Sequence, residues 1–329
     1  MTGWASASER AERARVAERA ERLRRLVRRS VLIVPANVPR FVERAHLRGA
    51  DAVMLDLEDS IPPDQKEAAR RALGEAIPSL GRGGADVLVR INKPFELAIE
   101  DLDAAVVPGL AAIGFPKAER GREVAILDAL LRERELRRGL PPGAIGLAVA
   151  VETAGGLGHV DEILAGSDRI ETVDVGAEDL GRELEIEPSA TGEELLFARQ
   201  TVVQAARRAG VQPLGLATTL ANYGDLAALR ESAARAAAMG FRGAGCIHPA
   251  QVPVLNELFQ PPAASVERAQ RVLARYEEAL AAGRASAALD GQMIDVPVAE
   301  RARLLIARAD AIAHKEAAKR KALGRLVEG

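Results

Sequence analysis

The sequence has little of three features that would place it in a specialised class. It has one cysteine among 329 residues, Cys246, which excludes an intramolecular disulfide framework and fits a reducing compartment. Its formal net charge is −2, so it lacks the positive excess that binding to nucleic acid or an anionic membrane requires. No apolar run approaches the roughly 18 residues that span a bilayer, and the N-terminus lacks the apolar core of a secretory signal. We therefore expect a cytoplasmic protein that acts on small molecules, without nucleic-acid or membrane partners.

Residues 8–29 are predicted to form a charged helix. Arginines are numerous in this segment, but glutamates alternate with them at positions 9, 12, 18 and 21, and organellar transit peptides are poor in acids. The spacing allows Glu–Arg pairs one helical turn apart. We expect residues 1–29 to form a helical extension that is solvated, or that packs against a partner subunit or the end of the main domain.

Short apolar runs alternate with longer amphipathic ones along the middle of the chain, a pattern typical of parallel βα units. Several runs are rich in Val, Ile and Leu without alternation, as in strands buried on both faces. Eight such units predict a (β/α)8 TIM barrel, with a doubly wound open sheet as the alternative. The expected strands are Val31–Val34, Ala52–Leu57, Val87–Ile91, Ala112–Phe115, Ile145–Val151, Thr172–Val175, Leu214–Ala217 and Gly243–Ile247.

The C-terminal part follows a different pattern. A predicted helix over residues 266–282 is followed by a small, polar segment, by Asp290–Asp295, and by a final helix from Pro297. A linker rich in Gly, Ala and Ser would let this part move or reach a neighbouring subunit. We divide the chain into the extension at residues 1–29, a barrel at residues 30–262, and a C-terminal helical lid or oligomerisation segment at residues 263–329.

Two carboxylates stand just past the ends of apolar strands. Glu152 closes the run that begins at Ile145, and Asp179 follows the run that begins at Val173. In a parallel α/β protein the carboxyl ends of the strands meet at the active-site face. Two hard oxygen ligands there predict a Mg²⁺ site, with Mn²⁺ as the alternative metal.

Polar residues collect at the other predicted strand ends as well. A barrel would bring them to one mouth, giving an acid-rich site that contains Arg90 and Lys117. A bound metal ion would let several carboxylates share this space without strong mutual elevation of their pKa values. The set comprises Asn37, Arg40, Asp56, Glu58, Asp59, Arg90, Asn92, Lys117, Glu119, Glu152, Glu178, Asp179, Thr218, Thr219 and His248.

Each of these residues also has a structural interpretation. Glu152 and Asp179 precede predicted helices, where an acid is favoured as a cap or by the helix dipole. Asp56 and Asp59 flank the turn that begins at Ser60, so turn chemistry explains them equally well. Arg90 is also placed to pair with Asp56 across adjacent strands. This pairing is compatible with function, since the acid would hold the guanidinium in place.

Two further features are weaker signals. The Gly-rich turn Thr153–Gly158 enters a helix and has the composition to present backbone N–H groups to an anion, but it matches no nucleotide-binding fingerprint. His248 stands before Pro249, where a histidine is more often structural than catalytic.

Eight ordered motifs resemble the citrate lyase beta subunit family, which includes malyl-CoA and citramalyl-CoA lyases. The resemblance covers about residues 30–312. The motifs are Val34–Phe41, Leu55–Ser60, Val89–Asn92, Gly114–Lys117, Val151–Ala154, Gly176–Leu180, Cys246–Pro249 and Asp290–Asp295.

The resemblance implies a TIM barrel that binds Mg²⁺ through Glu152 and Asp179. It implies that Arg90 stabilises the enolate or carboxylate of the reacting groups, and that Asp295 completes the site of a neighbouring subunit in a homotrimer or hexamer. With Arg90 and Asp295 we place Glu58 in the catalytic group, and Asp56 and Asp59 as its supporting acids. The remaining candidates, for substrate and CoA binding, are Asn37, Arg40, Lys117, Ala177 and Glu178. Helix capping before Pro297 is the structural alternative for Asp295.

The expected reaction is Mg²⁺-dependent cleavage of a β-hydroxyacyl-CoA thioester, of malyl, citramalyl or citryl type, to acetyl-CoA and a 2-oxo acid. Two departures from the family pattern bear on it: Ala36 and Val38 replace the usual glycine and basic residue, and Thr218-Thr219 stands where many members carry an Asp. They raise the question of whether CoA is used. The alternatives are a metal-dependent aldolase on free 2-oxo acids, a malyl-CoA thioesterase, and a non-catalytic acyl-thioester-binding subunit of a lyase complex.

Overall fold

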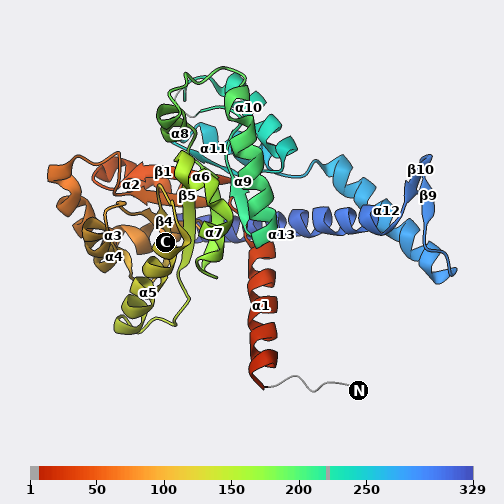
Figure 1. The fold of residues 1–329 in the computed structure, drawn as a ribbon, viewed down its shortest axis with the longest axis horizontal. Helices are drawn as coiled ribbons and strands as arrows, with labels where there is room; N and C mark the ends of the chain where they lie inside the picture. Colours follow the sequence, from red (N-terminus) through yellow and green to blue (C-terminus); the bar gives the residue numbers. More distant parts are fainter. Residues whose placement is uncertain (1–6, 220–222, 329) are drawn as a thin grey trace. The chain divides into compact units, whose positions relative to one another are not determined.

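Eight parallel strands form a nearly closed barrel (Figure 1). The computed structural model describes residues 7–219 and 223–328. Neighbouring strands pair in the order β7-β6-β5-β4-β3-β2-β1-β8, and all seven pairings are parallel. Two backbone hydrogen bonds connect the ends of this series, from Gly215 N to Gly243 O at 2.9 Å and from Arg242 N to Pro213 O at 2.9 Å. The predicted TIM barrel is confirmed, and the open sheet is excluded.

The strands lie close to the predicted ranges. They are β1 (Ser30–Pro35), β2 (Ala52–Asp56), β3 (Asp86–Arg90), β4 (Leu110–Phe115), β5 (Gly146–Val151), β6 (Ile170–Val175), β7 (Gln212–Leu214) and β8 (Ala244–Cys246). The prediction for the seventh strand was wrong in its range, since the strand ends at Leu214. Gly215 has a φ of +154°, and a Cβ at this position would lie 2.9 Å from the Phe241 ring, so the chain turns away here.

The helices alternate with the strands and lie outside the barrel (Figure 1). The α-helices of the barrel region are α2 (Pro39–Ala45), α3 (Lys66–Gly81), α4 (Phe95–Ala105), α5 (Gly121–Arg137), α6 (Ala154–Gly158), α7 (Val160–Ala165), α8 (Ala177–Glu183), α9 (Leu196–Ala209), α10 (Leu226–Met239) and α11 (Gln251–Leu258).

Small side chains line much of the barrel interior. The lowest layer is a cluster of buried residues that the inner faces of six strands contribute, and Met54 packs against it. Above this layer the inward positions include Gly114, Ala150 and Gly245, which leave space inside the barrel. The members of the lowest layer are Val31, Ala52, Leu88, Ala112, Ala148 and Leu214.

Paired charges fill the opposite, N-terminal end of the barrel. Arg28 donates to Asp86 Oδ2 at 3.1 Å and to Glu171 Oε2 at 2.7 Å. Arg29 binds both oxygens of Asp51, at 2.7 and 2.9 Å. Lys319, from the last part of the chain, donates to Asp51 Oδ1 at 2.7 Å. Both arginines and Asp51 are essentially inaccessible to water.

The chain divides into two compact units. One comprises residues 28–259 together with residues from 319 onward, and the other comprises residues up to 27 with residues 260–318. The second unit contains α1 (Ala7–Arg25), α12 (Ala263–Ala281), a two-stranded hairpin of β9 (Ala287–Leu289) and β10 (Gln292–Ile294), and most of α13 (Val296–Glu328). Its core is formed by apolar residues of α12, the hairpin and α13, among them Tyr276, Ile294 and Ala299.

The hairpin was not predicted. Its two-residue loop, Asp290-Gly291, has φ values of +51° and +76°, as a type I′ turn requires. This dipeptide is the usual signal for such a turn, but the flanking strands are only three residues long.

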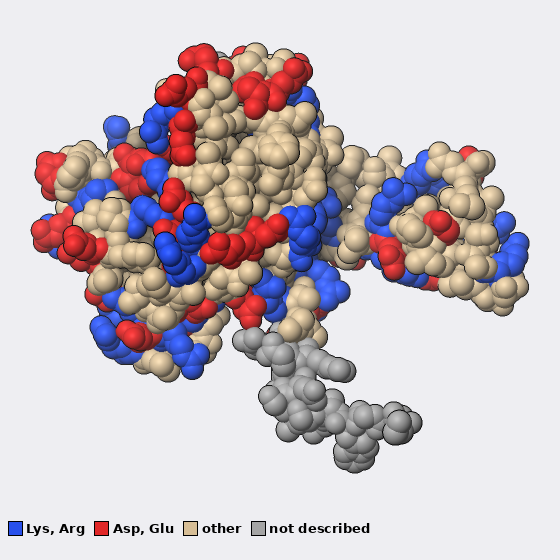
Figure 2. Space-filling model, viewed as in Figure 1, with Lys and Arg blue, Asp and Glu red and all other residues tan. Residues whose placement is uncertain are grey.

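The described residues contain no helix that is both long and apolar enough to cross a membrane. Lys and Arg side chains are interspersed with Asp and Glu over the visible face of each unit (Figure 2).

Candidate active site

An arginine–carboxylate pair joins two neighbouring strands at the C-terminal end of the barrel. Asp56 and Arg90 are paired in register on β2 and β3. Arg90 Nε and Nη2 donate to the two oxygens of Asp56 at 2.7 and 2.8 Å. Asp56 also accepts bonds from the amides of Glu58 and Ser60, so both the turn interpretation and the pairing are correct for it. Burial alone would raise the pKa of Asp56, but hydrogen bonding and the charge of Arg90 hold it below the usual range.

Lys117 connects several acids at the same end of the barrel. Its Nζ lies 2.5 Å from Glu58 Oε1, 3.0 Å from Asp59 Oδ2 and 3.7 Å from Asp179 Oδ2. Glu58 also lies 3.1 Å from Arg90 Nη1. Lys117 has a φ of +48°, a left-handed conformation that is uncommon for a residue with a side chain. The structure therefore brings the predicted residues Glu58, Asp59, Lys117 and Asp179 together.

Glu152 lies buried beside this group, with 7% of its surface exposed. Its Oε2 accepts one hydrogen bond, from the Lys117 amide at 2.9 Å. Gly176 makes room for it, since a Cβ at that position would lie 2.4 Å from Glu152 Cγ. Burial raises the pKa of Glu152 to about 7, and the charge of Glu58 adds to the effect. Glu152 does not cap the next helix, because Thr153 does so through its bond to Gly156 N.

Glu152 and Asp179 line one pocket at the barrel mouth. Asp179 lies in the first turn of α8, after the N-cap residue Gly176. Its negative charge there is also favoured by the helix dipole. Among residues 7–219 and 223–328 no cluster of three or more His, Cys, Asp or Glu side chains forms a closed metal cage. Mg²⁺ does not need one, because it is usually held by one or two carboxylates, by water and by substrate oxygens. The donor set therefore fits Mg²⁺.

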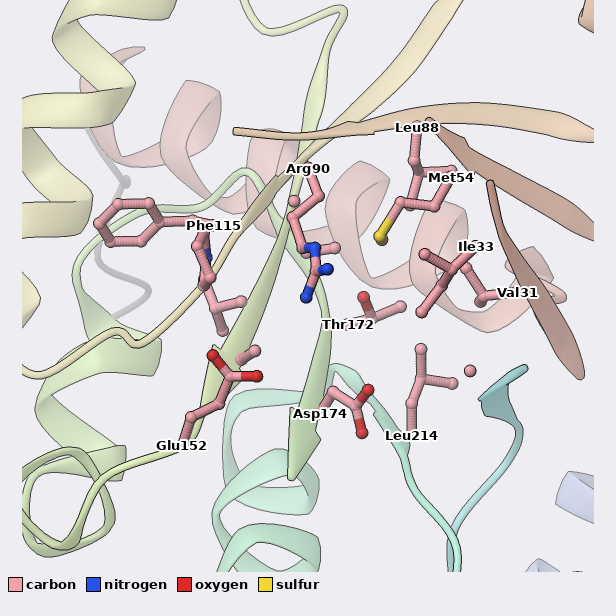
Figure 3. Close-up of a pocket in the computed structure, with 16 residues that line it drawn as sticks. Val31, Ile33, Met54, Leu88, Arg90, Phe115, Glu152, Thr172, Asp174 and Leu214 are labelled. Carbon is pink, nitrogen blue, oxygen red and sulfur yellow. The ribbon is translucent and has the colours of Figure 1, made fainter. Parts of the chain in front are cut away.

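Two connected spaces run from the mouth into the barrel. We call the outer one the mouth pocket; it contains Arg90, Glu152 and residues 174–179, with Thr218 and Thr219. We call the inner one the barrel cavity; it shares Arg90, Glu152 and Asp174 with the mouth pocket (Figure 3). Its remaining wall is largely apolar and includes Met54, Leu88 and Leu214, as Figure 3 shows.

Asp174 is a site residue that the sequence analysis missed. It lies on β6 two positions after Thr172, and both residues face the barrel cavity. Burial raises the pKa of Asp174 to about 7, and the charge of Glu152 adds to this. An acid within the predicted strand Thr172–Val175 was the available signal, but the sequence did not show which face of the strand this acid occupies.

The remaining predicted binding residues fall into two places. Ala177 and Glu178 line the mouth pocket. Asn37 and Arg40 lie instead at the end of β1, where Asn37 Nδ2 donates to Gln65 Oε1 at 2.6 Å. Arg40 lies 4.8 Å from the Phe41 ring centroid. It lines a separate outer pocket with Phe41, Arg48, Ile247 and His248.

Thr218 is held in place by α10. Its amide and its hydroxyl both donate to Ser232 Oγ, at 3.0 and 2.8 Å. The rest of this turn, residues 220–222, lies outside the described residues. Thr218 and Thr219 therefore offer hydroxyl groups, and no charge, to the mouth pocket.

The two weaker signals have structural explanations. Thr153 accepts from Gly156 N at 2.9 Å, and Glu183 accepts from Ala154 N at 3.0 Å, so the Gly-rich turn binds its own side chains. His248 accepts from Ala250 N at 3.2 Å and stacks on Tyr223 at 5.6 Å between ring centroids. Cys246 is buried, and burial raises the pKa of its thiol to about 12, as expected of an inert cysteine.

Asp295 belongs to the second unit. It stands immediately before α13, and its Oδ1 accepts from Val298 N at 3.4 Å, a long capping contact. The backbone carbonyl of Asp295 accepts from Ala299 N at 3.0 Å. The capping interpretation thus accounts for its local position, and its part in catalysis remains a prediction.

Comparison with protein families identifies the barrel. The model of the HpcH/HpaI aldolase/citrate lyase family matches residues 29–249. The chain belongs to this family. Like the named members described next, it is a carbon–carbon lyase, which confirms the resemblance drawn from the eight motifs.

Curated relatives cover most of the chain. The citrate lyase subunit beta of Escherichia coli K12 is 35% identical over 284 residues, which is 86% of this chain and 93% of the relative. The L-malyl-CoA/beta-methylmalyl-CoA lyase of Cereibacter sphaeroides ATCC 17025 is 30% identical over 305 residues, covering 86% and 95%. The family is therefore certain, while these relatives act on different acyl groups.

A solved structure of CitE from Mycobacterium tuberculosis is also similar. Its sequence is 31% identical and its TM-score is 0.67. The match covers 87% of this chain and 99% of the CitE chain. That structure holds magnesium, acetoacetate and coenzyme A. A second structure, of the M. tuberculosis citrate lyase beta subunit, has a TM-score of 0.58 at 30% identity, with 72% and 99% coverage, and holds oxaloacetate and magnesium.

Proposed function

We propose that this lyase cleaves a β-hydroxyacyl-CoA thioester to acetyl-CoA and a 2-oxo acid, with Mg²⁺ bound by Glu152 and Asp179. The observation that carries the proposal is the charge balance of the mouth pocket. Glu152 is buried there with a pKa of about 7 and without a cationic hydrogen-bond partner, close to Arg90 and to the lysine that contacts Asp179. A divalent cation bound between these two acids would supply the missing positive charge.

When bound, Mg²⁺ would act as a Lewis acid that lowers the pKa of the substrate hydroxyl and binds the adjacent carboxylate. The chain positions its own groups around that ion. The Lys117 amide fixes one oxygen of Glu152 and leaves the other free. Gly176 allows the carboxylate to lie against the backbone of the β6–α8 turn.

Arg90 would balance the negative charge that develops as the carbon–carbon bond breaks. The hydroxyl gives its proton to solvent, the bond between the carbinol carbon and the methylene carbon breaks, and the electron pair of that bond forms the enolate of acetyl-CoA. Asp56 holds Arg90 in a bidentate pair, so the guanidinium is already oriented before substrate binds. A preorganised charged donor of this kind contributes roughly 3–4 kcal/mol to the transition state.

The enolate then takes a proton at its methylene carbon. We assign the donation of this proton to Asp295 of a neighbouring subunit in a homotrimer or hexamer, and Asp295 then regains a proton from solvent. The support is the position of Asp295 at the junction between the hairpin and α13. Both elements share one apolar core, so this unit could hold Asp295 rigidly against another subunit. Glu58, bound to both Arg90 and Lys117, would keep these two cations in place.

The CoA moiety would extend from the mouth pocket toward the outer pocket. Arg40, Arg48 and the Phe41 ring line that pocket and suit a phosphorylated, partly aromatic group. Arg48 was not among the predicted residues. It offers a cation near the turn in which Val38 replaces the usual basic residue.

The test is to purify the chain alone and to assay malyl-, citramalyl- and citryl-CoA with Mg²⁺, measuring the 2-oxo acid, acetyl-CoA and free CoA. We expect equal amounts of 2-oxo acid and acetyl-CoA. Free CoA without 2-oxo acid would indicate a thioesterase, and cleavage only of free hydroxy acids would indicate an aldolase. Binding of a thioester without any turnover would indicate a non-catalytic subunit.

A pair of variants separates the metal site from general charge effects. Glu152→Ala should abolish both turnover and Mg²⁺ binding. Glu119→Gln is the matched control: Glu119 follows the neighbouring strand β4, but its predicted place among the mouth acids is wrong, since its side chain is exposed and lines neither pocket. Unchanged turnover and unchanged Mg²⁺ affinity in Glu152→Ala would overturn the assignment.

A further inference from the structure

Asp174 is the one carboxylate that reaches both the mouth pocket and the barrel cavity from within a strand. In Figure 3 its side chain lies between those of Glu152 and Leu214. Among the described residues, the carboxylate of Asp174 accepts a single hydrogen bond, from the amide of Val175 at 2.7 Å. Arg90 acts on Asp174 electrostatically, but no salt bridge joins Asp174 to a Lys or Arg side chain in the described part of the chain. A half-buried carboxylate with so few partners is costly, so its presence calls for a role.

The cations of the site are already engaged elsewhere. Arg90 binds both oxygens of Asp56 and approaches Glu58, and Lys117 binds Glu58 and Asp59. The barrel cavity below them has an apolar wall. The raised pKa of Asp174 reports the same imbalance, since it arises from burial and then from the charge of Glu152. The cation that a further anion beside Asp174 would meet is Arg90, which lines the barrel cavity and is already paired with Asp56 and Glu58.

The three candidate thioesters differ in one substituent of the carbinol carbon. Their carbinol carbon carries a hydroxyl, a carboxylate, the methylene group that leads to the thioester, and a fourth substituent. This substituent is hydrogen in malyl-CoA, methyl in citramalyl-CoA and a negatively charged carboxymethyl in citryl-CoA. If Mg²⁺ on Glu152 and Asp179 holds the hydroxyl and the carboxylate, and the thioester leaves through the mouth, the barrel cavity remains for the fourth substituent.

Resting on the function proposed above, we infer that Asp174 is a specificity-determining residue. It restricts the enzyme to thioesters whose 2-oxo acid half carries a single carboxylate. A hydrogen or a methyl group fits the apolar wall beside Asp174 without an unpaired charge. A carboxymethyl group would be desolvated next to Asp174, where Arg90 is already paired with two other carboxylates, and an arrangement of like charges of this kind discriminates strongly against a ligand. The product is therefore glyoxylate or pyruvate rather than oxaloacetate.

The experiment measures kcat/KM for malyl-, citramalyl- and citryl-CoA in three proteins: the wild type, Asp174→Asn and the charge control Glu119→Gln. In the wild type we expect kcat/KM for citryl-CoA to be at least 100-fold below the better of the other two. Asp174→Asn keeps the shape of the side chain and removes its charge, so the ratio of citryl to malyl or citramalyl cleavage should rise at least tenfold. Glu119→Gln should keep the wild-type ratio within about twofold.

Equal wild-type cleavage of citryl-CoA, or an unchanged ratio in Asp174→Asn, would overturn the inference. A second measurement on the wild type alone covers the case in which the variant does not fold. With Mg²⁺ present, pyruvate should bind at least tenfold more tightly than oxaloacetate, and equal or tighter binding of oxaloacetate would also overturn the inference. If the wild type cleaves no thioester, the proposed function fails, while the binding comparison still decides the role of Asp174.

Discussion

The two ends of the barrel differ in the balance between cationic and anionic side chains. At the N-terminal end three cations face three carboxylates: Arg28, Arg29 and Lys319 pair with Asp51, Asp86 and Glu171. At the C-terminal end three cations, Arg90, Lys117 and the largely exposed Arg182, face six carboxylates. Those six are Asp56, Glu58, Asp59, Glu152, Asp174 and Asp179. The charges at the N-terminal end balance, whereas the C-terminal end has an excess of negative charge that a bound cation would offset.

The pKa values follow this difference. At the N-terminal end burial would raise the pKa of Asp51, but Arg29 and Lys319 bring it below its usual value. At the C-terminal end burial raises the pKa values of Glu58, Glu152 and Asp174, and the cations present do not reverse this. A paired network stabilises the fold, whereas unpaired acids in a cleft are typical of a functional site.

The largest expected effect is on catalysis at the C-terminal end. Glu152→Gln should lower kcat/KM by roughly 10³-fold or more, because Lewis-acid activation by the bound metal contributes several kcal/mol. Its free energy of unfolding without metal should stay the same or rise, since a buried charge is removed. Steady-state kinetics and urea unfolding check both results. A loss of stability that accounts for the loss of activity would contradict the comparison.

At the N-terminal end the largest effect should be on stability. Asp51→Asn leaves Arg29 and Lys319 buried without their shared carboxylate, which should cost about 3–5 kcal/mol of unfolding free energy. The folded fraction should retain wild-type kcat/KM. Urea unfolding and active-site titration of the remaining protein test this, and a change below about 1 kcal/mol would show that this network contributes little.

The two ends should also respond to pH with opposite signs. Because the pKa of Asp51 is lowered, its contribution is present above the unfolded value of 3.8 and is lost as the pH falls. Because the pKa of Glu152 is raised from 4.5 to about 7, its favourable contribution is present below 4.5 and is lost as the pH rises through 7. The second change amounts to roughly 3 kcal/mol.

Urea unfolding of the metal-free protein at pH 5 and pH 8 measures the second change. Glu152→Gln should be less sensitive to pH across this window than the wild type. Equal sensitivity of the two proteins would argue against an ionisable Glu152 in the folded state.

The smallest of these effects is expected for the arginine clamp. Arg90→Lys keeps the charge but loses the bidentate bond to Asp56, so kcat should fall about 10²-fold with a smaller change in KM. A larger effect on KM than on kcat would assign Arg90 to ground-state binding.

The sequence alone was sufficient to predict the barrel, because a parallel strand buried on both faces is a recognisable apolar run. It also predicted Glu152 and Asp179, since a carboxylate after such a run falls at the active-site end. It did not predict Asp174, because the face that a side chain occupies depends on the register of the strands around the barrel. The charge balance of either end depends on pairs such as Arg29–Asp51 and Lys319–Asp51, whose members are far apart in the chain.

The most direct test of the charge deficit at the C-terminal end is the effect of Mg²⁺ on thermal unfolding. Wild-type protein, Glu152→Gln, Asp179→Asn and Glu119→Gln are titrated with MgCl2 at constant ionic strength and pH 8. We predict that Tm rises in a saturable way for the wild type and for Glu119→Gln, and does not change for the other two. The same rise in Glu152→Gln or Asp179→Asn, or no rise in the wild type with a 2-oxo acid present, would contradict the assignment of the metal site.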